Sequence, residues 1–239
     1  MIPLHDDNPT SITPVVTIAT IAACVLVFLY EASLPAEAGE LFVYRYGAIP
    51  ALFLGGAEPP PELAGASPYA GLLTSMFLHG GWMHLIGNML YLWIFGNNVE
   101  DVMGHARFVL FYLLCGLLAA LSHGLIDPSS TVPMVGASGA ISGVLGAYLL
   151  LFPHARVLVL LPLGFFSRVM YVPAGFVLGL WFLMQLLSGG MTLGRGGGGV
   201  AFWAHIGGFV AGMALIGVFK RSEVRFFAPR RSRRWESEW

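Results

Sequence analysis

Charged residues are scarce in this chain. Its 239 residues are 56% hydrophobic and only 10% charged, and the mean hydropathy is +0.75. A soluble domain carries about 25% charged residues, so the composition excludes an ordinary soluble globular protein. We expect a polytopic membrane protein that contacts the lipid bilayer and has no nucleic-acid partner.

Cysteine is also scarce, and the N-terminus lacks positive charge. Cys24 and Cys115 both lie in apolar runs, which predicts buried free thiols instead of a disulfide. The first seven residues are acidic and do not form the positive n-region of a signal peptide. The first apolar run is therefore expected to remain in the protein as a helix.

Six apolar segments are long enough to cross roughly 30 Å of hydrocarbon. They lie near 14–30, 82–98, 107–125, 136–152, 169–188 and 201–219. We predict an all-α membrane protein, with a six-span domain over 14–219 between a short N-terminal segment (1–13) and a basic tail (220–239). The 31–81 stretch is expected to be a structured surface loop with amphipathic pieces around 50–56 and 68–79, and the apolar 153–168 stretch is expected at the membrane interface.

The basic residues are unevenly divided between the two sides of this topology. Six spans place both termini on one side, and Lys and Arg are enriched in cytoplasmic segments. With cytoplasmic termini, the outer segments hold only Arg45 and Arg195. The cytoplasmic segments then hold Arg107, Arg156, Arg168, Lys220, Arg221, Arg225, Arg230, Arg231, Arg233 and Arg234. We predict this orientation, in a prokaryotic plasma membrane.

A serine and a histidine, each flanked by glycines, open two of the predicted spans. Ser138 lies in a Gly-rich run over 136–143, and His205 starts the last span. At about 1.5 Å per residue, Ser138, His205 and His84 all fall roughly 9 Å below the outer surface, with Asn88 one helical turn deeper than His84. These four side chains therefore share one layer if their helices are neighbours.

Small residues four positions apart favour close contact between two of these helices. Gly139 and Gly143 follow the serine, and Gly208 and Gly212 follow the histidine. Such pairs let membrane helices approach closely, although they often serve packing alone. A close crossing here would bring Ser138 within hydrogen-bond reach of His205.

The predicted spans contain no Asp or Glu. Asp127 falls in an outer loop, and Glu100 and Asp101 fall at the cytoplasmic end of the second span. A Ser-His-Asp triad is therefore not available at this depth, and a Ser138–His205 dyad is what remains.

Four motifs resemble those of the rhomboid family of intramembrane serine proteases. They are a Gly-x-Ser-Gly motif at 136–139, a histidine followed by small residues at 205–212, a His-x-x-x-Asn motif at 84–88, and a Glu-containing turn that ends in Arg-Phe at 98–108. The resemblance covers nearly the whole chain, in the family order. One position departs from it: many members carry an aromatic residue four positions after the serine, and here that residue is Ser142.

The resemblance implies hydrolysis of peptide bonds in transmembrane protein substrates. Ser138 would be the nucleophile and His205 the general base and then the acid. The Asn88 amide, the His84 ring and the Ser138 backbone N–H would hold the oxyanion. No metal ion or other cofactor is expected.

The loop before the last span is expected to control access. Four consecutive glycines, 196–199, remove the side chains that limit backbone freedom. We predict that Gly197, Gly198 and the adjacent Trp203 belong to a mobile cap that lifts before a substrate enters.

Other classes of protein remain open alternatives. A metal-dependent membrane enzyme could use His79, His84 and His205 as ligands, although the chain has no His-Glu-x-x-His motif. A non-catalytic rhomboid-like protein would bind transmembrane clients, but would be expected to have lost the serine or the histidine. A transporter would show broken helices or inverted repeats, which the sequence does not indicate.

Overall fold

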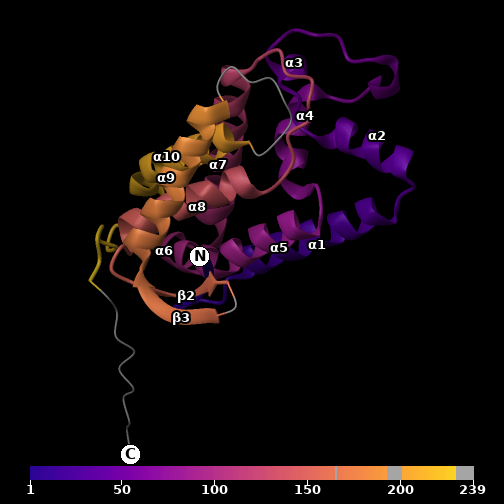
Figure 1. Ribbon diagram of the computed structural model, residues 1–239. Coiled ribbons are helices and arrows are strands. Elements are labelled where there is room, and N and C mark those ends of the chain that lie inside the picture. Colours follow the sequence, from indigo (N-terminus) through magenta and orange to yellow (C-terminus); the bar gives the residue numbers. More distant parts are fainter. Residues whose placement is uncertain (165, 193–200, 230–239) are drawn as a thin grey trace, which may run out of the picture.

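The structure is a computed structural model that describes residues 1–164, 166–192 and 201–229 (Figure 1). Its longer helices are α1 (Val15–Ser33), α2 (Ala36–Tyr46), α5 (Trp82–Tyr91), α7 (His105–Ile126), α8 (Ser138–Leu151), α9 (Ala174–Thr192) and α10 (Phe202–Phe219). Shorter helical pieces are α3 (Pro50–Phe53), η1 (Pro61–Leu63), α4 (Pro68–Thr74), η2 (Ser75–Phe77), η3 (Leu92–Gly96) and α6 (Asn97–Met103). The strands are β1 (Ile2–Asp6), β2 (Arg156–Leu163) and β3 (Phe166–Pro173).

Four helices among the described residues are long and apolar enough to cross a membrane, namely α1, α7, α9 and α10. The apolar helix α8 is shorter. The second predicted span runs through α5, the π-helical turn η3 and α6 without a break in the helical segment. The chain is thus a mostly helical, multi-pass membrane protein, while the count of six spans stays a prediction.

The predicted loop over 31–81 contains short helices at both places where amphipathic pieces were expected. Helix α3 falls within 50–56, and α4 with η2 covers most of 68–79. Helix α1 extends further than predicted, through Ser33, so Glu31 lies inside it. The predicted span 14–30 contains no acidic residue, and Glu31 lies in the last turn of the longer helix.

A small sheet at one end of the molecule corrects the all-α prediction. The strands β1, β2 and β3 form an antiparallel sheet in that order. Residues 169–173, expected in the fifth span, belong to β3 and pair with β2. Pro173 explains why the strand ends and the helix begins here. The residue before a proline is disfavoured in helical conformation, so Val172 stays extended and α9 begins directly after Pro173.

The sheet fastens the N-terminal segment to the helices through a buried carboxylate. Asp6 lies at the end of β1 and is 2% exposed. Its Oδ2 accepts hydrogen bonds from the Tyr148 hydroxyl at 2.6 Å and the Asn98 amide at 2.9 Å. Residues of α6 and α8 therefore hold the strand in place.

Burial makes this contact dependent on pH. Desolvation raises the pKa of the Asp6 carboxyl from 3.8 to about 6, although the Tyr148 hydrogen bond acts in the opposite direction. The folded protein then holds the proton more tightly than the unfolded chain, so this stabilisation is present below about pH 4 and is lost as pH rises through 6. The whole shift corresponds to roughly 3 kcal/mol.

We expect the thermal midpoint of the protein in detergent to fall as the pH rises from 4 to 7, and to fall by more than the midpoint of Asp6→Asn over the same range. Parallel pH curves for the two proteins would contradict this assignment.

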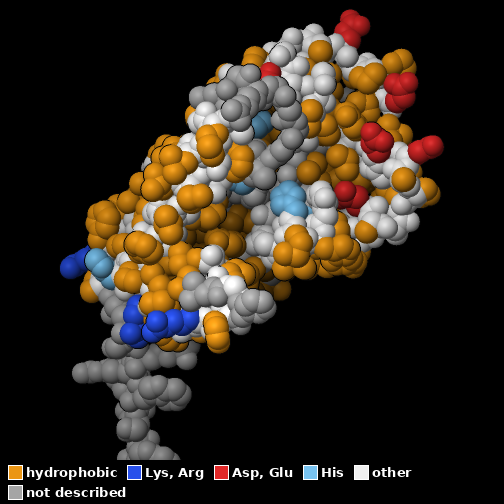
Figure 2. Space-filling view, viewed as in Figure 1, with side chains coloured by type: hydrophobic (Ala, Val, Ile, Leu, Met, Phe, Trp, Pro, Cys, Tyr) orange, Lys and Arg blue, Asp and Glu red, His pale blue; other side chains and the backbone are white. Residues whose placement is uncertain are grey.

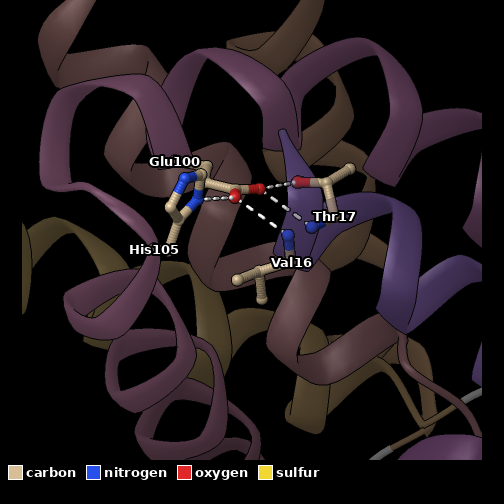
Figure 3. Close-up of polar contacts among 4 residues, drawn as sticks. All are labelled: Val16, Thr17, Glu100 and His105. Atoms are coloured by element: carbon tan, nitrogen blue, oxygen red, sulfur yellow. Dashed lines mark hydrogen bonds and ion pairs between the residues drawn. The ribbon is translucent and has the colours of Figure 1, made fainter. Parts of the chain in front are cut away.

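A second buried carboxylate caps helix α1 (Figure 3). Glu100 of α6 accepts hydrogen bonds from the backbone N–H groups of Val16 at 2.9 Å and Thr17 at 2.8 Å, and from the Thr17 hydroxyl at 2.7 Å. Its other contact is His105 Nδ1, 2.6 Å away. The first N–H groups of a helix have no partner within the helix and attract negative charge. Because Pro14 provides no side-chain cap, Glu100 supplies one from a distant part of the chain.

Helix α8 lies at the centre of the bundle, packed against α7 and α10 (Figure 1). The predicted close crossing of α8 and α10 is confirmed, because a Cβ added at Gly208 or Gly212 would collide with the backbone of Gly139 or Gly143. Tyr148 of α8 and Phe209 of α10 are among the largest fully buried side chains of the core. Cys24 and Cys115 are buried free thiols, as expected.

On one face of the molecule the visible charged side chains lie at opposite ends (Figure 2). On the face shown in Figure 2, Lys and Arg side chains gather at the end that holds β2 and β3, and Asp and Glu side chains gather at the opposite end. Hydrophobic side chains cover most of the surface between them. This is the distribution expected of a protein whose middle faces lipid.

Candidate active site

A turn at Gly136 delivers Ser138 to the start of α8. Gly136 has φ +118°, which side chains larger than hydrogen rarely adopt. A Cβ at this position would also lie 2.7 Å from the His84 ring. The Gly136 N–H donates to the Ser75 carbonyl at 2.8 Å, which fixes the turn. Glycine is therefore required here by both backbone conformation and space.

Ser138 meets His205 where α8 and α10 cross. His205 lies in the first turn of α10 and is 9% exposed. Its Nε2 is 2.8 Å from Ser138 Oγ. The glycine contact just below, between Gly139 and Gly208, sets this short distance, because bulkier residues would hold the helices apart.

The other ring nitrogen of His205 also has a partner, which sequence reasoning missed. His205 Nδ1 is 2.8 Å from Oε1 of Gln185 on α9. The Trp181 ring, one turn before Gln185, lies beside the imidazole with ring centroids 5.9 Å apart. An amide inside an otherwise apolar run was the available signal, since polar side chains in membrane helices tend to face the protein interior.

Ser142 has a different contact from the aromatic residue found at this position in many rhomboid proteins. Its hydroxyl donates to the Ser138 carbonyl at 2.6 Å, within the same helix. The side chain is buried and is directed at the backbone of α8. Besides its contact with Ser138 of α8, the ring of His205 is thus contacted from α9, by Gln185 and Trp181, and not by Ser142.

His84 and Asn88 border the turn that precedes Ser138. His84 Nε2 and Asn88 Nδ2 would lie 2.7 and 3.5 Å from a Cβ at Gly136. The Gly80 N–H donates to His84 Nδ1 at 3.3 Å, so the neutral ring carries its proton on Nε2, which faces Gly136. Asn88 Nδ2 is buried and has no hydrogen-bond partner among the described residues. Two N–H donors therefore converge beside Gly136, two residues before Ser138.

A small cavity of about 30 Å³ adjoins Ser138. Its walls include Gly116, Ala119 and Ala204 as well as Ser138 itself. Such a volume can hold one or two water molecules, so the site has room for the second reactant of a hydrolysis.

The predicted gating residues divide into two groups. Gly197 and Gly198 lie outside the described residues. Trp203 lies near α9, where a Cβ at Gly189 would be 3.5 Å from its indole ring. It belongs to the contact between α9 and α10 and does not touch Ser138 or His205 through any hydrogen bond of the described residues.

The ligands of the metal-dependent alternative do not assemble in the described part of the chain. His79 and His84 are neighbours, with ring centroids 5.2 Å apart. His205 instead contacts Ser138 and Gln185. Among the residues that the structure describes, no three His, Cys, Asp or Glu side chains are grouped so that they could hold a metal ion.

The structure is thus a bundle of apolar helices in which a serine hydroxyl contacts a histidine ring inside the membrane-spanning part. Residues 67–222 match the sequence profile of the Rhomboid domain. This match covers more than half of the chain, and the protein belongs to the rhomboid family.

Several curated relatives share part of this sequence. The chain is 33% identical over 148 residues to Rhomboid protein 1, mitochondrial, of Saccharomyces cerevisiae, a match that covers 59% of this chain and 39% of the relative. It is 45% identical over 78 residues to Rhomboid protease GluP of Bacillus subtilis, which covers 33% of this chain and 15% of GluP. The putative rhomboid protease YdcA of the same species is 38% identical over 78 residues, 33% of this chain and 39% of YdcA. The matches thus span less than half of these relatives' own lengths.

The relatives come from different membranes. They include mitochondrial and chloroplastic proteins as well as bacterial ones. Family membership therefore agrees with a multi-pass membrane protein and with several compartments besides the predicted prokaryotic plasma membrane.

Proposed function

We propose that this protein is an intramembrane serine endopeptidase that cleaves peptide bonds in or near the transmembrane segments of other membrane proteins. The observation that carries the proposal is the 2.8 Å contact between Ser138 Oγ and His205 Nε2, beside two converging N–H donors. Membership of a family with relatives named proteases supports the same conclusion.

The proposed first step forms an acyl-enzyme. His205 Nε2 accepts the proton of the Ser138 hydroxyl while Oγ attacks the carbonyl carbon of the scissile bond. The carbonyl oxygen becomes an oxyanion, and Asn88 Nδ2, His84 Nε2 and the Ser138 N–H can donate to it. The C–N bond then breaks, and His205 returns the proton to the departing amine.

The second step needs water. A water molecule gives a proton to His205 and attacks the ester carbon, and Ser138 recovers its proton as the acid product leaves. Preorganised donors act here again, because the same oxyanion forms a second time. The cavity beside Ser138 is a suitable place for this water.

The charge distribution supports a membrane placement for this chemistry. Lys and Arg favour the cytoplasmic side, and they gather at the sheet end of the molecule (Figure 2). We therefore place the sheet, the ends of α6, α8 and α10 and both termini in the cytoplasm. Ser138, at the opposite end of α8 from Leu151, then lies toward the outer half of the membrane.

Labelling with a fluorophosphonate tests the proposal directly. The full chain in proteoliposomes should form a covalent adduct at Ser138, located by peptide mass spectrometry, and should cleave members of a panel of single-span proteins. An unlabelled Ser138 with no cleavage of any panel member would instead favour the non-catalytic binder of transmembrane clients.

A further inference from the structure

Helix α9 carries one amide side chain, and that amide reaches the proposed catalytic histidine. Gln185 Oε1 is 2.8 Å from His205 Nδ1. The helix around it is apolar enough to span a membrane, and its neighbours Met184 and Leu186 are exposed on the bundle surface. A polar group at this depth is unfavourable without a hydrogen-bond partner, so the contact fixes which way the side chain points.

The identity of the accepting atom determines the tautomer of His205. An amide oxygen can only accept, so Nδ1 must carry a proton. The neutral imidazole then has its lone pair on Nε2, which is the atom that faces Ser138 Oγ. Ser138, His205 and Gln185 thus form one chain of hydrogen bonds across α8, α10 and α9.

We propose that Gln185 is a positioning residue that holds His205 in the tautomer and ring orientation needed for proton transfer from Ser138. The inference rests on the proposed function. In catalytic triads a carboxylate (serine proteases) or an amide (papain-like cysteine proteases) on the far side of the histidine orients the ring in this way. Here the neutral amide does so from a membrane helix, and no hydrogen bond or ion pair of the described residues joins an Asp or Glu to Ser138 or His205.

No other described side chain replaces Gln185 in this role. Ser142 directs its hydroxyl to the Ser138 carbonyl. Trp181 packs against the ring at an interplanar angle of 39° and offers no acceptor. Gln185 is four residues after Trp181, so both lie on the same face of α9. The two contacts have different effects: Trp181 restricts where the His205 ring lies, and Gln185 restricts how the ring is rotated and which nitrogen carries the proton.

Two substitutions separate positioning from packing. Gln185→Leu keeps an apolar side chain of similar size but removes the acceptor, and Gln185→Glu keeps the acceptor atom at the same reach. Met184→Leu, on the exposed face of the same helix, is the matched control. Each variant is assayed in proteoliposomes for kcat, KM, the rate of fluorophosphonate labelling at Ser138, and thermal midpoint.

We expect Gln185→Leu to lower kcat and the labelling rate together, by roughly 10–100-fold, as is usual for residues that orient another functional group. KM should stay within about twofold of the wild type, because the proposed role of Gln185 is in proton transfer and not in substrate binding. Gln185→Glu should recover most of the labelling rate, and Met184→Leu should match the wild type.

Three results would overturn the inference, and a fourth would overturn its basis. An active Gln185→Leu with wild-type labelling would show that the contact is dispensable. Equal losses in the Leu and Glu variants, or a loss explained by a lower thermal midpoint, would assign Gln185 to packing. If the wild type itself is neither labelled at Ser138 nor active, the proposed function fails instead.

Discussion

Replacing Ser138 with alanine is expected to abolish cleavage of transmembrane substrates while the protein stays folded. The hydroxyl is the nucleophile, and the 2.8 Å contact with His205 Nε2 is what makes it reactive. Removing His205 should have the same effect, because among the described residues no Asp or Glu is hydrogen-bonded to the pair and could take over proton transfer. We expect each rate to fall by roughly 10⁴–10⁶.

The double variant provides a sharper measurement than either single one. If the two residues act as a unit, Ser138→Ala with His205→Ala should be no slower than Ser138→Ala alone. Ser142→Ala is the matched control, since that serine is buried in the same helix and bonds only to the Ser138 carbonyl. Substantial cleavage by Ser138→Ala would exclude the serine mechanism. Inactivation by EDTA without phosphonate labelling would favour the metal-dependent alternative.

Asn88→Ala is expected to lower kcat by roughly 10²–10³ with little change in KM. Its amide Nδ2 is buried, lacks a partner among the described residues and borders the turn before Ser138. An N–H that donates to the oxyanion lowers the activation free energy by roughly 3–4 kcal/mol, because it stabilises mainly the transition state. His84→Ala should have a smaller effect, because the Ser138 N–H remains.

The control for this prediction is Asn98, a buried amide whose hydrogen bond goes to Asp6 of β1 and not to the dyad. Asn98→Ala should lower the thermal midpoint while leaving the kcat of the folded protein nearly unchanged. Wild-type kcat in both Asn88→Ala and His84→Ala would mean that the oxyanion is held by other groups.

The proximity of Ser138 and His205 could be anticipated because it follows from one-dimensional rules. The number of residues from each to the end of its span, at the rise of an α-helix, predicts the same depth in the membrane for both. The glycine spacing indicates which helices touch. The structure places these atoms together, and their catalytic roles remain a proposal. Gln185 could not be found in this way, because the direction of one amide depends on how α9 is rotated against α10.

The sheet was missed for a related reason. The apolar strands β2 and β3 have the composition of membrane segments, and β1 is short and polar at its end. Their pairing joins Ile2 to Leu160, a contact that no local pattern indicates. Short apolar runs cannot be assigned to helix or strand by periodicity alone, so 169–173 was placed in a helix.

The cap on α1 and the pairing of β1 impose an order on biogenesis. The chain is made from its N-terminus, yet the N–H groups of Val16 and Thr17 receive their acceptor only when Glu100 has been synthesised. The edge of β1 stays unpaired for longer, because Leu160, which pairs with Ile2, is synthesised later still. At typical rates of 5–20 residues per second this interval is roughly 10–30 s. Strand β1 is therefore synthesised well before its pairing partner, and through this interval it presents an unpaired strand edge to the translation and insertion machinery.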